Sequence, residues 1–337
     1  MTEKSSKTIP YDRIGVIGAG AWGTALAAIA IRAGRSVSLW AREPEVVESI
    51  TRTQQNAPFL PGLALPPLTC TGDMAAATAG AQALLVVVPA QHLRTSLLEV
   101  SLHAPPGIAL VICAKGIERG SGKLVTEVFA ETAPGFEPAI LSGPSFARDA
   151  ASGLPTAVTI AARADIARRL QASLSHATFR PYASDDLLGV ALGGAAKNVY
   201  AIASGMVDGL GLGESARAAL LARCFAELVR LGEALGARAE TLAGLSGLGD
   251  LVLTATSPSS RNFSFGREIG RGRAPAELSA AGQPLAEGVA TAPALVIRAG
   301  KEHIELPVAE TVASVLDGTL PLDAAIARLM SRPLKPE

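Results

Sequence analysis

A lysine lies in an otherwise uncharged run of small and apolar residues, Leu-Gly-Gly-Ala-Ala-Lys-Asn, which ends with Lys197 and Asn198. Burying an ammonium group in such surroundings is unfavourable, so the side chain needs a partner or a chemical role. Apolar surroundings also lower the pKa of a lysine, which then can transfer protons near neutral pH. Lys197 is therefore the first candidate for acid–base catalysis. The competing interpretation is a helix lysine whose amine extends into solvent.

A glycine pattern, Gly-x-Gly-x-x-Gly, occupies Gly18–Gly23, after an expected strand at 13–19 and before an expected helix at 24–33. In that context the pattern is typical of a dinucleotide site. Gly18 permits a tight turn, Gly20 lets the backbone approach a pyrophosphate, and Gly23 allows close packing of helix on strand. The N–H groups at the start of the helix would face the phosphates. The alternative is an ordinary glycine-rich turn.

The end of the second expected strand bears on the choice between NAD and NADP. An acidic residue there would hold the ribose 2′-hydroxyl. The sequence is instead Trp-Ala-Arg-Glu at 40–43, in which Arg42 can meet a 2′-phosphate. The residues thus favour NADP, with NAD possible, and the alternative for Arg42 is a solvated surface arginine.

Two further candidates follow expected strands, whose carboxyl ends bind ligands in open parallel sheets. Lys115 follows the strand at 108–114, and its alternative is a lysine that reaches solvent. Ser-Gly-Pro-Ser-Phe-Ala at 142–147 follows another strand and could present N–H groups and a hydroxyl to a ligand. The alternative for that segment is a plain strand–helix turn.

Polar groups also gather in the last third of the chain. Ser259-Ser260-Arg261-Asn262 places hydrogen-bond donors side by side, as a phosphate site requires, or else forms a polar helix cap. Gly-Leu-Gly-Asp at 247–250 places the carboxylate of Asp250 after a glycine turn, where it could also be a helix N-cap.

The expected elements change character along the chain. Strands at 13–19, 36–40, 84–88, 108–114 and 139–142 alternate with helices, and 158–161 and 179–182 could extend the sheet. This alternation predicts an α/β fold, a Rossmann-like doubly wound, mainly parallel sheet. Beyond about residue 190 the runs at 190–206, 214–235 and 284–301 favour an all-α C-terminal domain. We expect a dinucleotide-binding domain at 1–188 and a helical substrate-binding domain at 189–337, with glycine-rich loops at 205–213 and 244–249.

Composition excludes several classes of protein. The chain has 337 residues with 30 basic and 30 acidic side chains, which favours neither nucleic-acid nor membrane-surface binding. Its longest aliphatic stretch, Leu84–Val88, is far shorter than the ~20 residues of a spanning helix, so no membrane insertion is expected. Three scattered cysteines favour a reducing, cytoplasmic location, and the histidine spacing predicts no metal site.

Several runs together resemble the bacterial-type NAD(P)-dependent glycerol-3-phosphate dehydrogenases. They are GAGAWGTALA, NAPFLPG, LLVVVPA, AKGIE, SGPSFA, LGGAAKNVYAI, GLGDLVLTATSPSSRN and AEGVAT, in the family's order from Gly18 to Thr291. The resemblance implies a Rossmann domain, a helical domain, and reversible reduction of dihydroxyacetone phosphate to sn-glycerol 3-phosphate for glycerophospholipid synthesis. It also implies a homodimer.

The resemblance further assigns roles to single residues. Lys197 would be the proton acceptor in alcohol oxidation and the proton donor in reduction. The substrate would contact Lys115, Gly143, Ser145, Lys197, Asp250, Ser260, Arg261 and Asn262. The cofactor would contact Gly18, Gly20, Ala21, Trp22, Gly23, Arg42, Lys115, Ala147, Arg261, Leu285 and Glu287. Two positions depart from the family's usual residues, because Ala21 replaces a common serine and Leu285 an expected valine.

Two other functions remain open at this point. A related 3-hydroxy acid dehydrogenase would act on a carboxylate in place of a phosphate. A dinucleotide-sensing binding protein would bind the cofactor without turnover, and loss of NADPH absorbance with dihydroxyacetone phosphate would distinguish it.

Overall fold

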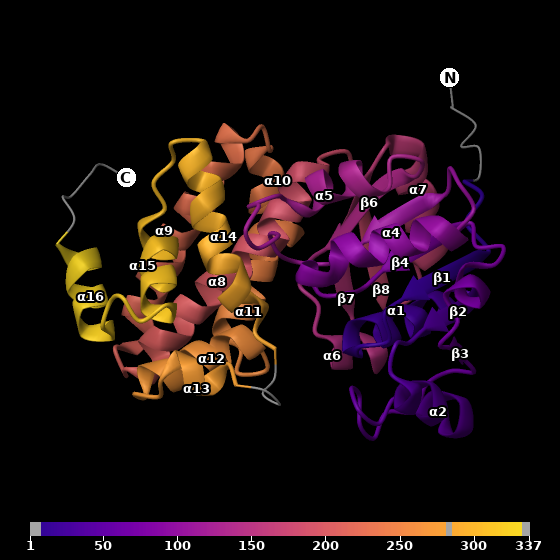
Figure 1. The fold of residues 1–337 in the computed structure, drawn as a ribbon, viewed down its shortest axis with the longest axis horizontal. Coiled ribbons are helices and arrows are strands. Elements are labelled where there is room, and N and C mark those ends of the chain that lie inside the picture. Colours follow the sequence, from indigo (N-terminus) through magenta and orange to yellow (C-terminus); the bar gives the residue numbers. More distant parts are fainter. Residues whose placement is uncertain (1–7, 281–284, 332–337) are drawn as a thin grey trace. The chain divides into compact units, whose positions relative to one another are not determined.

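The computed structural model describes residues 8–280 and 285–331 (Figure 1). The chain forms two compact units. The first holds the residues up to Ala114 together with Thr126–Val190, and the second holds Lys115–Val125 and the residues from Ala191 onward. Lys115 therefore belongs to the second unit although it follows a strand of the first.

The first unit is built on an eight-stranded sheet with the order β3-β2-β1-β4-β5-β6-β7-β8. All neighbouring strands are parallel except β6 and β7, which are antiparallel. The strands are β1 (Arg13–Ile17), β2 (Ser36–Trp40), β3 (Thr69–Thr71), β4 (Ala83–Val86), β5 (Ala109–Ile112), β6 (Glu137–Ser142), β7 (Thr156–Ala162) and β8 (Phe179–Ser184). The strand order reverses between β1 and β4, which is where ligands bind in such sheets.

Helices pack on the sheet because its central strands are apolar on both faces, as the fully buried β4 and β5 illustrate. Helix α1 (Ala21–Arg32) packs against α6 (Ala147–Ala151) and α7 (Ala164–Leu174). The remaining helices of this unit are α2 (Pro44–Thr53), α3 (Met74–Thr78), α4 (Leu93–His103), with the 3₁₀ turn η1 (Ala90–His92) before it, and α5 (Val125–Thr132).

The turn from β1 into α1 depends on two glycines. Gly18 has a φ of +110°, which side chains other than glycine rarely adopt. A Cβ on Gly23 would lie 1.8 Å from the carbonyl oxygen of Gly18, so α1 can approach the strand this closely only without a side chain there. These two positions fix the start of α1 directly against the end of β1.

The described part of the second unit is helical from Ala191 onward, and its other segment, Lys115–Val125, is a loop as far as Leu124, with one isolated β-bridge between Ile117 and Leu124. Its helices are α8 (Leu187–Gly209), α9 (Gly213–Ala234), α10 (Ala239–Ala243), a π-helical turn η2 (Leu245–Gly249), α11 (Asp250–Thr256), α12 (Arg261–Gly270), α13 (Pro275–Leu278), α14 (Glu287–Lys301), α15 (Pro307–Leu316) and α16 (Leu322–Met330). Helices α8 and α12 cross at glycines on both partners, since a Cβ on Gly205 would meet Phe263 O at 2.0 Å and one on Gly266 would meet Ile202 O at 2.0 Å.

Helix α8 is the central element of this unit. Of the described helices it is the one with the length and apolarity to cross a membrane, yet 89% of its apolar window is buried inside the structure. That burial is the behaviour of a core helix whose apolar residues pack against other helices.

The predicted fold class is confirmed, and all seven expected strands are present with shifts of a few residues at their ends. Helix α1 begins at Ala21, three residues earlier than expected. The predicted glycine-rich loop at 205–213 is correct only for 210–212, which joins α8 to α9, and the predicted loop at 244–249 is wrong for 245–249. Gly205–Gly209 continues α8, and 245–249 forms the π-helical turn, because in both segments glycine permits close helix contacts and does not end the helix. The assignment of cofactor and substrate to the domains 1–188 and 189–337 stays a prediction.

We expect Gly23→Ala to destabilise the first unit by about 1–3 kcal/mol, the usual range for overpacking, because the methyl group would collide with the Gly18 carbonyl. Gly135→Ala is the matched control, since its Cβ would meet nothing within 4 Å and its φ is not positive. Urea unfolding of both variants measures the difference. Equal midpoints would contradict the packing account of this turn.

Candidate active site

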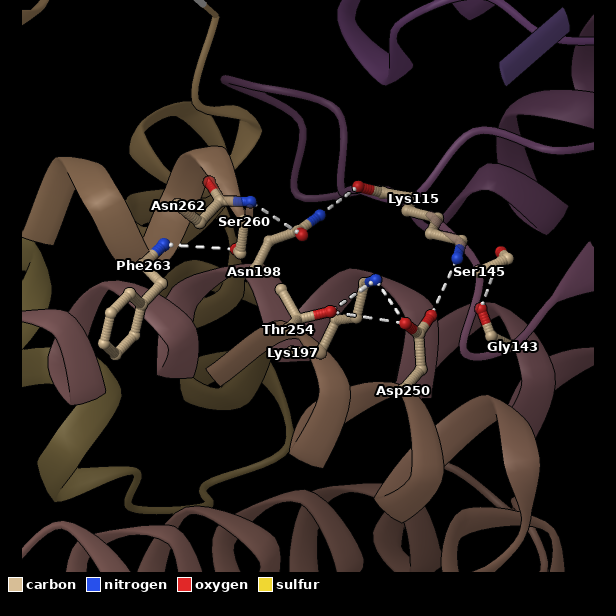
Figure 2. Close-up of polar contacts among 10 residues, drawn as sticks. All are labelled: Lys115, Gly143, Ser145, Lys197, Asn198, Asp250, Thr254, Ser260, Asn262 and Phe263. Carbon is tan, nitrogen blue, oxygen red and sulfur yellow. Dashed lines mark hydrogen bonds and ion pairs between the residues drawn. The ribbon is translucent and has the colours of Figure 1, made fainter. Parts of the chain in front are cut away.

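The centre of the candidate site is a carboxylate shared by two lysines. Lys197 Nζ donates to Asp250 Oδ1 at 2.5 Å, and Lys115 Nζ donates to Asp250 Oδ2 at 2.7 Å (Figure 2). Each oxygen of one carboxylate thus accepts a charge-assisted hydrogen bond from a different ammonium group. Asp250 is fully buried, and Lys197 is 7% exposed. Three of the residues singled out in the sequence therefore meet in one cluster within the second unit.

The approach of α11 to α8 follows from a missing side chain. A Cβ on Gly193 would lie 2.6 Å from the carbonyl oxygen of Ser246. Gly193 is one helical turn before Lys197, and Ser246 stands four residues before Asp250. The contact at Gly193 therefore brings the two segments together one turn away from the charged pair.

Thr254 completes the surroundings of the Lys197 amine. Its Oγ1 accepts a hydrogen bond from Lys197 Nζ at 2.9 Å and donates to Asp250 Oδ1 at 3.3 Å. The sequence analysis missed this residue. The available signal was its spacing four residues after Asp250, which places both side chains on one face of a helix.

The pKa of Lys197 is lowered to about 8, chiefly because burial disfavours its charged form. The nearby Lys115 ammonium lowers the pKa further, while the Asp250 carboxylate opposes both effects. The sequence predicted a downward shift from apolar surroundings, and the structure agrees in direction. A lysine with this pKa is neutral in part of the population near physiological pH, so it can both give and take a proton.

A chain of side-chain amides supports the cluster. Gly288 N–H donates to Asn262 Oδ1, Asn262 Nδ2 donates to Asn198 Oδ1, and Asn198 Nδ2 donates to Lys115 O, each at 2.9 Å. The Gly288 N–H at one end of this hydrogen-bond chain can only donate, and the Lys115 carbonyl at the other end can only accept. Each end therefore requires the same orientation of the Asn262 and Asn198 side-chain amides. The chain connects the first turn of α14, the start of α12, helix α8 and the Lys115 backbone.

The residues predicted to bind phosphate have structural contacts of their own. Ser260 is the N-cap of α12 and accepts from Phe263 N at 3.2 Å, so the alternative interpretation of a polar cap applies to its hydroxyl. Asn262 caps α14 through Gly288 and keeps one Nδ2 hydrogen beyond the bond to Asn198. Arg261 is exposed at the first position of α12.

The remaining predicted substrate contacts lie in the first unit, after β6. Gly143 has a φ of +150°, and a Cβ there would lie 2.8 Å from Val158 Cα, so close packing on β7 explains this glycine. The Ser145 hydroxyl donates to Gly143 O at 3.0 Å. Ala147 is the first residue of α6.

The glycine loop fits the pyrophosphate of a dinucleotide. Gly20 is the N-cap of α1 without a side-chain cap, and a Cβ built on it meets nothing within 4 Å. The backbone is therefore open to a ligand at the helix N-terminus, where N–H groups and the helix dipole favour anions. Ala21 and Trp22 are the first two residues of that helix.

Of the contacts predicted for the rest of the cofactor, Arg42 and Leu285 are exposed and Glu287 is half-buried. Arg42 has 72% of its side chain exposed and pairs with Glu43 at 2.6 Å, so it lies on the surface as the alternative interpretation required. Leu285 is 52% exposed, and Glu287 begins α14. In the part of the chain that the structure describes, no group of three or more histidine, cysteine and acidic residues could hold a metal ion.

Comparison with known proteins identifies the family of the chain. A family model described as the N-terminus of NAD-dependent glycerol-3-phosphate dehydrogenase matches residues 13–167, and one for the C-terminus matches residues 186–327. The chain belongs to this family. A Bradyrhizobium sp. (strain ORS 278) relative named glycerol-3-phosphate dehydrogenase [NAD(P)+] is 56% identical, over 97% of this chain and 98% of its own length.

Two other similar proteins extend the comparison. A Parvibaculum lavamentivorans relative of the same name is 52% identical, over 98% of this chain and 99% of its own length. The crystal structure of glycerol-3-phosphate dehydrogenase from Coxiella burnetii has a TM-score of 0.91 and 36% identity, and the match covers 96% of this chain and 99% of that one. The resemblance drawn from the motifs is therefore confirmed.

Opposite changes in the Lys197 pKa are expected from two variants of its neighbours. Asp250→Asn removes the negative charge that raises this pKa, so the value should fall below about 8. Lys115→Met removes a neighbouring positive charge that lowers it, so the value should rise. NMR titration of the lysine Nζ signals measures both shifts.

The control for these two variants is Lys301→Met, which removes an exposed lysine that bonds Ser121 O. It should leave the Lys197 pKa unchanged. If the Asp250 and Lys115 variants moved the pKa in the same direction, the electrostatic account of the cluster would be wrong.

Proposed function

We propose that this chain catalyses the reversible, NAD(P)H-dependent reduction of dihydroxyacetone phosphate to sn-glycerol 3-phosphate. The observation that carries the proposal is the buried amine of Lys197, which shares Asp250 with Lys115 and has a pKa lowered to about 8. The names of the similar proteins supply the substrate class. Because these similar proteins are named as dehydrogenases, they favour an enzyme over a binding protein that senses the dinucleotide without turnover.

In this proposal Lys197 moves the proton. During reduction the substrate carbonyl oxygen gains negative charge, and the Lys197 ammonium gives its proton to that oxygen. During oxidation the neutral amine removes the proton from the substrate hydroxyl. A pKa near the working pH lets one group serve both directions. The nicotinamide cofactor, when bound, supplies or accepts the hydride at the adjacent carbon.

Lys115 and Asp250 hold the charges around this proton transfer. With both amines protonated, the three side chains carry one excess positive charge, which stabilises an oxygen that becomes negative. Asp250 fixes the direction of both amines, and Thr254 gives the Lys197 amine a second acceptor. The cluster is preorganised, so little reorganisation is needed when charge develops.

We assign Ser260, Arg261 and Asn262 to the substrate phosphate, with Gly143 and Ser145 as further contacts. The support is a guanidinium exposed at the start of α12 beside the remaining amide hydrogen of Asn262. The phosphate does not react, but its binding energy orients the carbonyl for reaction. The α12 N-terminus also favours an anion.

The cofactor assignment rests on the glycine loop and on Arg42. We propose that Gly18–Gly23 and Ala147 contact the dinucleotide in the first unit, and Lys115, Arg261, Leu285 and Glu287 in the second. Arg42 would change its partner from Glu43 to the 2′-phosphate, which favours NADP over NAD.

The cellular setting is part of the same proposal. The product would supply glycerophospholipid synthesis, and the chain would work in the cytoplasm as a homodimer. The support for the compartment is the odd number and the scattered positions of the cysteines in the sequence. The support for the pathway and the dimer is the resemblance to the family.

The direct test of the proposed function is loss of NADPH absorbance on addition of dihydroxyacetone phosphate. The account predicts turnover with this substrate, and much slower turnover with 2-oxo and 3-oxo acids that carry a carboxylate in place of the phosphate. Cofactor binding without turnover of any of these substrates would contradict the proposal.

We predict that Lys197→Met lowers kcat by about 100-fold or more, the usual scale for loss of a positioned acid–base group. Methionine retains the length and apolar volume but has no ammonium. Lys197→Arg should not restore activity, because a guanidinium does not deprotonate near neutral pH. Stopped-flow turnover with NADPH binding as a control measures the effect. Near-normal kcat in a variant that still binds NADPH would make Lys115 the leading candidate.

We predict that Arg42→Ala reduces the NADPH-to-NADH ratio of kcat/KM by about 10-fold or more, because one charge-assisted hydrogen bond is lost. Arg52→Ala is the matched control, since Arg52 is also an exposed arginine of the first unit and pairs with Glu48. The comparison uses initial rates with both cofactors. A ratio that Arg42→Ala leaves unchanged would refute the 2′-phosphate assignment.

A further inference from the structure

A fully buried asparagine outside the glycine pattern holds the centre of the glycine loop. Asn56 lies between α2 and β3, and its side chain has no exposed surface. Its Nδ2 donates to the carbonyl oxygen of Ala19 at 2.8 Å and to Thr24 Oγ1 at 2.7 Å. Ala19 stands between Gly18 and Gly20, at the turn from β1 into α1.

Every polar atom of the Asn56 side chain is used in this arrangement. Both Nδ2 hydrogens are donated, and Oδ1 accepts from Phe59 N at 3.3 Å. Thr24 Oγ1 in turn donates to Ala19 O at 3.3 Å. The Ala19 carbonyl therefore receives two hydrogen bonds from buried side chains, and its direction is fixed by both.

The direction of this carbonyl determines the direction of the next N–H group. In a planar trans peptide the C=O and the following N–H point opposite ways. With Ala19 O held toward buried Asn56, the N–H of Gly20 points away from it. Gly20 is also the residue whose missing Cβ leaves open space at the helix N-terminus.

We propose that Asn56 is a positioning residue for the dinucleotide site. It holds the Ala19 carbonyl in the interior, so that the loop presents the Gly20 N–H and no carbonyl dipole to the anionic pyrophosphate. The inference rests on the proposed cofactor site, and it names a residue that has no contact with the cofactor in the proposed function.

The segment that carries Asn56 also supports the helix start by packing. The Asn56 carbonyl accepts from Leu60 N at 2.7 Å, and Leu60 is buried in one cluster with Ala25 and Ala151. Trp22 packs against this cluster. Asn56 thus holds both the Ala19 carbonyl and the short turn at 56–60, whose Leu60 belongs to the cluster that Trp22 packs against.

The experiment measures the Kd for NADPH by quenching of the fluorescence of Trp22 and Trp40, the two tryptophans of the chain. Asn56→Ala should raise Kd by about 10-fold, since loss of the buried donors frees the loop carbonyl. Asn56→Asp should raise Kd further, because an acceptor would then face the Ala19 oxygen. At saturating NADPH, kcat and the KM for dihydroxyacetone phosphate should stay within about twofold of wild type.

The matched control is Ser173→Ala. Ser173 is also fully buried in the first unit and links Tyr11 N to Arg169 O, away from the glycine loop. This variant should lose thermal stability and keep the wild-type Kd. If the alanine variant does not fold, Asn56→Ser, which retains one donor, replaces it in the experiment. Its Kd for NADPH should lie between those of wild type and Asn56→Asp.

Two results would overturn the inference. One is a wild-type Kd in Asn56→Ala or, if that variant does not fold, in Asn56→Ser. The other is an equal rise of Kd in Ser173→Ala, which would mean a general loss of stability of the unit. A wild-type chain that bound neither NADPH nor NADH would instead overturn the proposed function, and this inference with it.

Discussion

One buried carboxylate between two ammonium groups is the interaction on which the candidate site depends. Asp250 has no exposed surface, and it joins Lys197 and Lys115, which stand 53 and 135 positions away in the sequence. Without it, two cations would remain close together in a desolvated place, which is strongly unfavourable. With the Asp250 carboxylate present, the three side chains carry one net positive charge. The carboxylate also raises the pKa of Lys197 against the effect of burial, and the resulting value of about 8 allows proton transfer near neutral pH.

The rest of the second unit makes this arrangement possible through close helix contacts. Gly193 lets the turn before α11 touch α8, and glycines on α8 and α12 let those helices cross at backbone distance. The crossing brings Asn198 and Asn262 within hydrogen-bonding distance, and their amides extend the network to α14 and to the Lys115 carbonyl. Small residues thus set the helix spacing, and polar residues at the same contacts set the geometry of the site.

The sequence predicted the alternating elements because their apolar periodicity is local, and it selected Lys197, Lys115 and Asp250 as separate candidates. It did not pair them, since a salt bridge over 135 positions leaves no local pattern. Thr254 and Asn56 were missed, and Asn198 was named without a role, because a polar residue in a helix or loop looks ordinary until its partner is known. The segments 205–209 and 245–249 were expected as loops because glycine usually marks a turn, whereas here it marks close packing.

The most direct test of the central claim is the pH dependence of kcat/KM in both directions of the reaction. Oxidation of glycerol 3-phosphate needs neutral Lys197, so its rate should rise with pH and level off above an apparent pKa of about 8. Reduction needs the ammonium, so its rate should fall as pH rises through the same value. Profiles that rose together, or that showed no transition near this pH in either direction, would contradict proton transfer by Lys197.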